Sequence, residues 1–212
     1  MAAFEFACYC KCMKELREVR ANFNETTITV YQAFMPEIAL PAAETGKFGS
    51  GFKYDRMTWI KPSFLWMMYR SGWASKPGQE CILAIEITRT GFEWALSRSA
   101  LSHYEAKIHN NKEHWKSSLC EPVRIQWDPE RDISLNRLSR RSLQVGLSGE
   151  AVHLYCNHWI VAISNQTDRA KEIRDLITEG RVDMANKLLP VERRYPVPDE
   201  IAVRIGSEAD SA

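Results

Sequence analysis

The amino-acid sequence predicts an α+β fold, a single mixed domain with about five strands and five helices. Segments rich in β-branched and aromatic residues, which are typical of strands, alternate with segments that carry helix start and stop residues. The chain has 212 residues, of which 45% are hydrophobic and 26% are charged, so it is long and apolar enough to fold around its own core. Its net charge of +1 argues against both an acidic disordered protein and a strongly basic polyanion binder.

The first half of the chain predicts three strands and three helices. The strand segments are Thr27–Phe34, Met57–Lys61 and Cys81–Thr88. A first helix is expected from Pro36 to Gly46, because proline favours a helix start and glycine favours a helix end. A second helix is expected over Ser63–Ser71, closed by Gly72. Thr90 and Glu93 have the spacing of a capping box, which predicts the start of a third helix.

The second half predicts two strands and then three helices. The strands are Val123–Trp127 and Ser142–Leu147, joined by the charged connection Asp128–Arg141. The helices are expected from Gly149 to Ile160 on apolar periodicity, over Asp168–Thr178 with Thr167 as its cap, and over Val182–Leu189.

The ends of the chain are expected to lie outside the domain. We place the domain at residues 15–196, with an N-terminal extension at 1–14 and a flexible C-terminal tail at 197–212, where prolines lead into a small polar segment. No apolar run reaches the roughly 18 to 20 residues that span a bilayer, and the first residues lack the pattern of a signal peptide. We therefore expect an intracellular, cytoplasmic protein with no membrane partner.

Three cysteines of the extension, Cys8, Cys10 and Cys12, alternate along the chain. In an extended segment their thiols would lie on one side, an arrangement that suits a soft metal. Structural zinc sites instead separate paired cysteines by two to four residues, and this spacing is absent. The alternative is an extension without metal, so we assign no metal-binding residues.

The best candidate for ligand binding is the stretch from Lys53 to Lys76. It holds five basic residues and one acidic residue, a local excess of +4, interleaved with aromatic residues. Cations beside aromatic rings bind phosphates while a ring stacks on a base, because the ring supplies area and the cation supplies charge. The candidate residues are Arg56, Trp59, Lys61 and Arg70. The alternative is structural: Trp66 and Trp73 are seven residues apart, the spacing of one buried helix stripe, and the cations would then form a solvated face.

Two further segments carry charged or small residues at strand ends. The segment from Trp127 to Arg131 predicts a turn that presents Glu130 and Arg131 to a cleft, or one that satisfies its own ion pairs. Gln144–Glu150 places small residues between a strand and a helix, where backbone N–H groups can meet an anion. This segment fits neither the dinucleotide glycine pattern nor the phosphate-loop pattern, which argues against a Rossmann dehydrogenase and a phosphate-loop ATPase.

Four segments together resemble the family catalogued as domain of unknown function 4291. They are Thr29–Phe34, Arg56–Trp73, Arg124–Arg131 and Gln144–Glu150. The resemblance extends from about Glu15 to Pro196, and its longest segment has eighteen residues. It implies no particular reaction.

The order of the elements is also similar, more weakly, to the ADP-ribosyltransferase superfamily, which implies NAD as cofactor. That resemblance assigns Gln32 or Tyr31 on the first strand, Thr58 on the second, and one of Gln126, Glu130 or Glu150 on a later element as the residues that hold NAD and orient the ribose. It implies that Arg56, Lys61 and Arg70 clamp the pyrophosphate and that Trp59 stacks on a ring. Gln32 departs from the family pattern because an amide supplies no charge.

Two other classes of function explain the same residues. An RNA- or nucleotide-binding module without catalysis would use the arginines, with Arg124 and Arg131 added, and the aromatic rings, but it needs no carboxylate. The feature that separates it from a transferase is whether Glu130 or Glu150 faces the same cleft as Arg56 and Thr58. A protein scaffold would instead expose a flat aromatic patch. The sequence indicates no particular protein partner.

Overall fold

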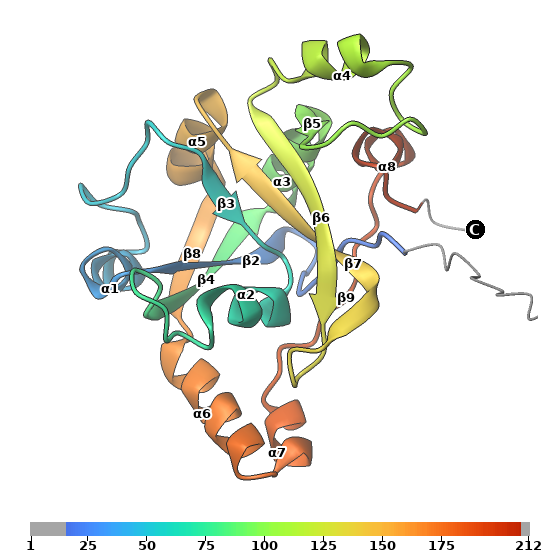
Figure 1. Ribbon diagram of the computed structural model, residues 1–212. Helices are drawn as coiled ribbons and strands as arrows, with labels where there is room; N and C mark the ends of the chain where they lie inside the picture. The colour runs from blue at the N-terminus through green and yellow to red at the C-terminus, as the bar shows by residue number, and fades with distance from the viewer. Residues whose placement is uncertain (1–15, 209–212) are drawn as a thin grey trace, which may run out of the picture.

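The computed structural model describes residues 16–208, and their fold is α+β (Figure 1). This range contains nine strands and eight α-helices, more than the five strands and the five or six helices expected, because several elements are only two to six residues long. The alternating cysteines Cys8, Cys10 and Cys12 lie outside the described residues.

Two antiparallel-type sheets form the centre of the molecule. The first has the order β2-β4-β8, with β2 at Thr27–Phe34, β4 at Cys81–Thr88 and β8 at Ile160–Asn165. The second has the order β3-β7-β6-β5, with β3 at Thr58–Ile60, β7 at Arg137–Leu147, β6 at Val123–Arg131 and β5 at Ser99–Leu101. Only the β5–β6 pair is parallel in these two sheets. The backbones of Tyr31 and Lys61 bond to each other, with N···O distances of 2.7 and 3.2 Å, and so join β2 to the end of β3.

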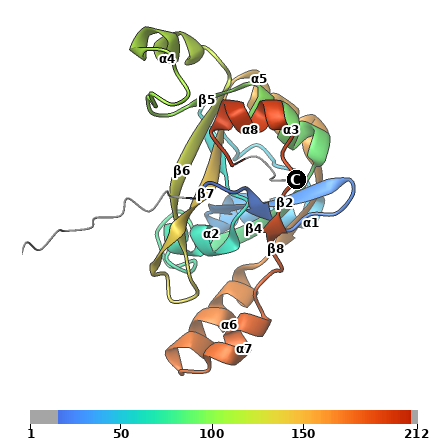
Figure 2. The ribbon, with the colours of Figure 1, turned by 90° about the vertical axis from the view of Figure 1, so that its right-hand side faces the viewer.

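The helices surround these sheets, and a small third sheet pairs β1 (Arg20–Ala21) with β9 (Arg193–Arg194). The helices are α1 (Pro36–Thr45), α2 (Phe64–Ser71), α3 (Arg89–Ser97), α4 (Lys112–Ser118), α5 (Glu150–Leu154), α6 (Thr167–Thr178), α7 (Val182–Lys187) and α8 (Asp199–Ile205). A π-helical turn, η1 (Tyr155–Trp159), lies between α5 and β8. Figures 1 and 2 both show α6 and α7 side by side, projecting away from the two sheets.

The segment from Thr27 to Thr88 folds largely as its residues predict. Strands β2 and β4 have the expected bounds, and α1 begins at Pro36 and ends at Gly46, which has a φ of 71°. Helix α2 is capped by the Ser63 hydroxyl, which accepts from the Trp66 backbone N at 3.1 Å. It ends at Gly72 with a φ of 60°, a conformation that glycine adopts without strain.

The capping box expected at Thr90 and Glu93 is wrong. Helix α3 begins two residues earlier, because Thr88 at the end of β4 is its cap and accepts from the Gly91 backbone N at 3.2 Å. Glu93 instead accepts a hydrogen bond of 2.5 Å from the Tyr195 hydroxyl, which ties α3 to the C-terminal part of the chain.

The charged connection expected over Asp128–Arg141 is also wrong, because both strands continue through it. Strand β6 extends to Arg131 and β7 begins at Arg137. Proline removes a backbone donor and is tolerated only where that donor would face no partner strand. Pro129 meets this condition, because β5 pairs with β6 only as far as Ile125 and leaves that edge open.

The helix expected from Gly149 to Ile160 stops early. Its apolar positions continue into η1, after which Ile160 begins β8 and pairs with β4. The strand has no clean alternation, since only Ile163 among its six residues is buried. Apolar periodicity alone therefore extends the predicted helix into residues that form a strand, because it carries no information about pairing with β4.

The tail expected to be flexible contains helix α8. Its Ala202 and Ile205 are buried, and the Ile205 carbonyl accepts a hydrogen bond of 2.7 Å from the Trp127 indole. Burial of two apolar side chains and a bonded indole fix this helix against α3 and β5. The expectation of a flexible tail was therefore wrong for Asp199–Ile205.

No helix within residues 16–208 has the length and apolarity to cross a membrane.

Candidate functional site: a cationic pocket at the junction of the two sheets

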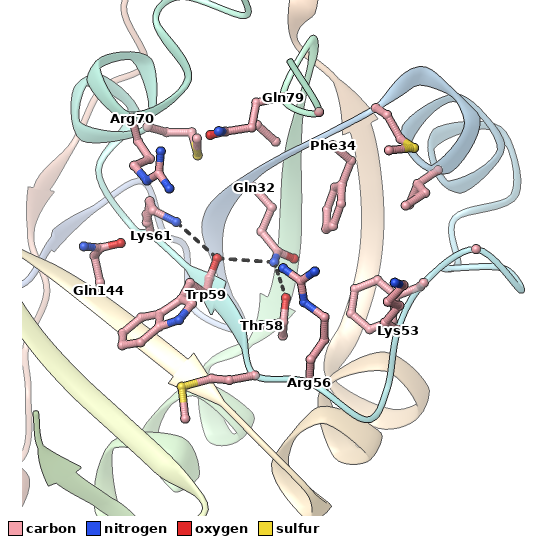
Figure 3. Close-up of a pocket in the computed structure, with 18 of the residues that line it drawn as sticks. Gln32, Phe34, Lys53, Arg56, Thr58, Trp59, Lys61, Arg70, Gln79 and Gln144 are labelled. Carbon is pink, nitrogen blue, oxygen red and sulfur yellow. Dashed lines mark hydrogen bonds between the residues drawn. The ribbon is translucent and has the colours of Figure 1, made fainter. Parts of the chain in front are cut away.

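A pocket of about 650 Å³ lies where β2, β3 and α2 meet (Figure 3). A volume of this size accommodates a nucleotide or a similar small molecule. The residues that line it are Gln32, Ala33, Phe34, Met35, Ile38, Gly51, Phe52, Lys53, Arg56, Met57, Thr58, Trp59, Lys61, Met67, Arg70, Pro77, Gly78, Gln79, Gln126 and Gln144.

The charged residues of this lining are all cations: Lys53, Arg56, Lys61 and Arg70. Three of them, Lys53, Arg56 and Arg70, are exposed, and none forms an ion pair with a carboxylate within residues 16–208. Cations gathered in one cavity without acidic partners give it a positive potential that attracts anions. The charge of the lining therefore suits a negatively charged group.

Lys61 is the buried cation of the pocket, with 6% of its surface exposed. Its Nζ donates to the Trp59 backbone oxygen at 3.3 Å. Burial, together with the nearby Arg70 guanidinium, lowers the pKa of Lys61 to about 7, although Asp128 acts in the opposite direction. At neutral pH this side chain therefore exists both as an ammonium ion and as a neutral amine.

Gln32 and Thr58 meet on the pocket wall and bind each other. The Gln32 Nε2 donates to the Thr58 Oγ1 at 2.7 Å and to the Trp59 backbone oxygen at 3.3 Å (Figure 3). The Gln32 Oε1 accepts from the hydroxyl of the fully buried Tyr155 at 2.8 Å. This network fixes the orientation of the amide, and it leaves the Thr58 hydroxyl proton available to a ligand.

Two further amides on the wall share one carboxylate. Gln126 and Gln144 are cross-strand partners on β6 and β7. Gln126 donates to the Asp128 Oδ1 at 3.0 Å, and Gln144 donates to the Asp128 Oδ2. Because the carboxylate holds both amide nitrogens, the amide oxygens remain as acceptors for donor groups of a ligand, such as hydroxyls.

Among the residues that the sequence predicts for the site, seven line this pocket: Gln32, Arg56, Thr58, Trp59, Lys61, Arg70 and Gln126. Tyr31 does not line it, because its ring is buried in the apolar cluster around α2. Tyr31 packs instead on Phe64 with a centroid distance of 5.4 Å, and burial raises the pKa of its hydroxyl.

The two candidate glutamates lie away from the pocket lining. Glu130 is buried, and its Oε1 accepts from the Ser63 hydroxyl at 3.0 Å and from the Arg131 backbone N at 2.8 Å. It thus anchors the residue that caps α2. Glu150 is exposed at the start of α5.

Two candidate arginines also lie outside the lining. Arg124 donates to the backbone oxygens of Glu121, at 2.6 Å, and Leu119. The Arg131 guanidinium lies 3.6 Å from the centroid of the Tyr69 ring. The pairing of β6 with β7 shifts register between Pro129 and Arg131, so the alternation of faces along β6 breaks before Arg131.

The small residues of Gln144–Glu150 serve packing at this site. A Cβ on Gly146 would lie 2.7 Å from the Met57 Sδ and 3.0 Å from the Trp59 ring. The missing side chain therefore lets the Trp59 ring lie across β7 along the pocket wall. The sequence analysis missed Lys53 and Gln144, although both lie in segments that it singled out, and Gln79, for which no signal was present.

The start of α2 is held by a second carboxylate. The Glu192 Oε1 accepts from the Phe64 backbone N at 2.6 Å. Burial is the main cause that raises the pKa of Glu192 to about 8, and the nearby Glu130 adds to the effect. Glu130 and Glu192 thus position the helix that carries Arg70 in its last turn.

The raised pKa of Glu192 predicts a pH-dependent stability. The folded protein retains a proton that the unfolded chain releases above about 4.3, so the associated stability is present below that pH and is lost as the pH rises through about 8. Glu192→Gln keeps an oxygen acceptor for the Phe64 backbone N and removes this titration. Between pH 5 and 8, we expect the thermal midpoint of the variant to fall less than that of the wild type. Parallel curves would contradict the prediction.

Metal ligands do not gather in this part of the molecule. Within residues 16–208, no three His, Cys, Asp or Glu side chains come close enough together to hold a metal ion.

These features define an α+β protein with a cationic pocket of nucleotide size at the junction of two sheets. The chain belongs to the family described as Domain of unknown function (DUF4291), whose model matches residues 18–195. The matched range includes every residue of the pocket lining. No curated protein is significantly similar to the chain.

Proposed function

We propose that this protein binds a nucleotide through its phosphate groups in the cationic pocket. The observation that carries the proposal is that four cations and no carboxylate line one cavity of about 650 Å³. Arginine binds phosphate oxygens through two parallel N–H groups, and a phosphate completes the charge balance that the pocket lacks.

The neutral part of the lining suits the rest of a nucleotide. Trp59 is half-buried and offers a ring on which a base can stack. The amide oxygens of Gln126 and Gln144 are acceptors for ribose hydroxyls. A pocket of about 650 Å³ favours a mononucleotide or dinucleotide over an RNA strand, which would need a longer basic groove.

Binding without ADP-ribosyl transfer is the function that the site supports best. Transfer of ADP-ribose from NAD requires a carboxylate that stabilises the developing positive charge of the ribose. Neither Glu130 nor Glu150 lines the pocket, and the Gln32 amide supplies no charge. NAD therefore enters the proposal as a ligand to be tested beside other nucleotides.

The first test is a thermal-shift panel with ATP, NAD, a short single-stranded RNA and sodium sulfate. A ligand at about a hundred times its dissociation constant adds roughly 2.7 kcal/mol to the free energy of unfolding, which raises the midpoint by several degrees. We expect ATP or NAD to produce that shift. A shift with RNA alone would replace the proposal by RNA binding, and no shift with any compound would refute it.

Replacing Arg56 and Arg70 together with alanine should weaken nucleotide binding at least about tenfold, because each arginine contributes a charge-assisted contact. The midpoint of the unliganded protein should hardly change, because both side chains are exposed. A matched control, Lys171→Ala with Arg174→Ala on α6, removes the same charge far from the pocket and should leave the affinity unchanged. Calorimetric titration measures the nucleotide affinity of both double variants. Equal losses in the two double variants would show a general charge effect in place of a site.

A further inference from the structure

Lys61 differs from the other cations of the pocket in its surroundings. It is buried, yet its amine lines the cavity and has only the Trp59 backbone oxygen, at 3.3 Å, as a hydrogen-bond partner within residues 16–208. No ion pair links it to a carboxylate of that range. An ammonium ion has three protons to satisfy, and burial with a single acceptor disfavours its charge. The site therefore suits a neutral amine that is accessible from the cavity.

The charged groups around Lys61 favour the same state. Arg70 faces it from α2, and Lys53 and Arg56 reach the pocket from the loop before β3. Among the described residues, the acidic group that acts on it is Asp128 of β6, whose oxygens accept hydrogen bonds from Gln126 and Gln144. The resulting pKa of about 7 leaves about half of the Lys61 side chains as free amine at neutral pH. An ordinary lysine has fewer than about one in a thousand in that form.

We propose that Lys61 is a nucleophilic amine that forms an imine with a phosphorylated aldose, a sugar phosphate whose anomeric carbon is unsubstituted. The inference rests on the proposed function, because the exposed cations Lys53, Arg56 and Arg70 would hold the phosphate while the aldehyde carbon reaches the Lys61 Nζ. A buried lysine beside another cation is a recurring way to make this nucleophile.

The condensation is balanced by the loss of one water molecule. The lone pair of the Lys61 Nζ attacks C1 of the open-chain sugar, a C–N bond forms, and the carbonyl oxygen takes the proton that the amine releases. The carbinolamine then expels its hydroxyl group as water, with a second proton from the nitrogen, and a C=N double bond remains. The adjacent Thr58 hydroxyl and the Gln126 and Gln144 oxygens can hydrogen-bond the sugar hydroxyls during these steps.

The test is reductive trapping on the full chain with ribose 5-phosphate and sodium cyanoborohydride, followed by peptide mass spectrometry. We expect the ribitol-phosphate adduct on Lys61 at a rate at least about tenfold above that of any other lysine at pH 7. The rate at Lys61 should reach half its maximum near pH 7, whereas rates at exposed lysines rise towards pH 10. Lys61→Arg keeps the charge and should abolish the fast adduct.

The controls separate the inference from the proposed function. Ribose, which lacks phosphate, should label Lys61 at least about tenfold more slowly, and ADP, which binds but has no aldehyde, should protect it. ADP-ribose in place of ribose 5-phosphate distinguishes a nucleotide sugar from a simple sugar phosphate. A thermal shift with ADP but no fast labelling of Lys61 by either sugar would refute the inference and keep nucleotide binding. Fast labelling without a shift by ADP would keep the inference and refute nucleotide binding, and equal labelling by ribose would refute the phosphorylated class.

Discussion

Replacing Trp66 with alanine should lower the free energy of unfolding by about 3 kcal/mol. Trp66 is 6% exposed and stacks on Tyr69, with a centroid distance of 5.1 Å, while the Arg131 guanidinium lies 5.7 Å from its ring centre. Truncation of a buried tryptophan costs about 3 to 5 kcal/mol, and the value depends on how well the surroundings close the cavity. The low end applies here, because the exposed Tyr69 ring and the long Arg131 side chain can move towards the vacated space.

A conservative variant tests whether packing of the ring alone explains this loss of stability. The Trp66 indole Nε1 is buried and has no hydrogen-bond partner among the described residues. Trp66→Phe therefore loses no hydrogen bond and keeps a ring for Tyr69 and Arg131, so we expect it to cost less than half as much as Trp66→Ala. Urea unfolding of both variants measures the difference. A loss below about 1 kcal/mol for Trp66→Ala would place the ring at the surface and reopen its use as a ligand contact.

The elements that the sequence predicts best are those whose ends carry a physical signal. Pro36 and Gly46 bound α1, and Ser63 and Gly72 bound α2, because fixed φ, capping and left-handed geometry act locally. Strand β8 carries no such signal, since five of its six residues are not buried. It is a strand because β4 offers it hydrogen-bonding groups, which is a property of the folded molecule.

The residues of the candidate site also differ in how well the sequence predicts them. Arg56, Trp59, Lys61 and Arg70 lie within one short stretch of sequence, so their basic and aromatic composition already indicates a common surface. The contributions from distant strands depend on register. The pairing of β6 with β7 shifts register between Pro129 and Arg131, and no pattern in the sequence reports this shift.

The low pKa of Lys61 follows from burial and from the position of Arg70, neither of which sequence spacing reveals. The sequence analysis assigned Lys61 to phosphate binding on its charge alone. The fold adds that Lys61 is the buried member of the four cations. Burial favours the neutral amine, which is the form that the proposed imine requires.

Gly91→Ala should destabilise the protein by about 1 to 3 kcal/mol, although helix propensity predicts the opposite. Alanine in a helix is favoured over glycine by about 1 kcal/mol. A Cβ on Gly91 of α3 would, however, lie 2.6 Å from Cδ1 and 2.7 Å from Cδ2 of the Trp159 indole. That ring is 7% exposed and packs against Trp94, so it has little room to move. Overpacking of a core costs about 1 to 3 kcal/mol or more, which exceeds the gain in propensity.

A double-mutant cycle identifies the Trp159 ring as the cause. Trp159→Ala removes the ring together with its Cγ, the atom nearest the added Cβ, and should itself cost about 3 to 5 kcal/mol. In that background the added Cβ meets open space, so Gly91→Ala should become neutral or stabilising by up to about 1 kcal/mol, and the coupling measured by urea unfolding should exceed about 1 kcal/mol. Equal destabilisation in both backgrounds would mean that another part of α3 excludes the methyl group. Because Trp159 ends the π-helical turn that leads into β8, a positive result would also explain why α3 carries glycine where η1 crosses it.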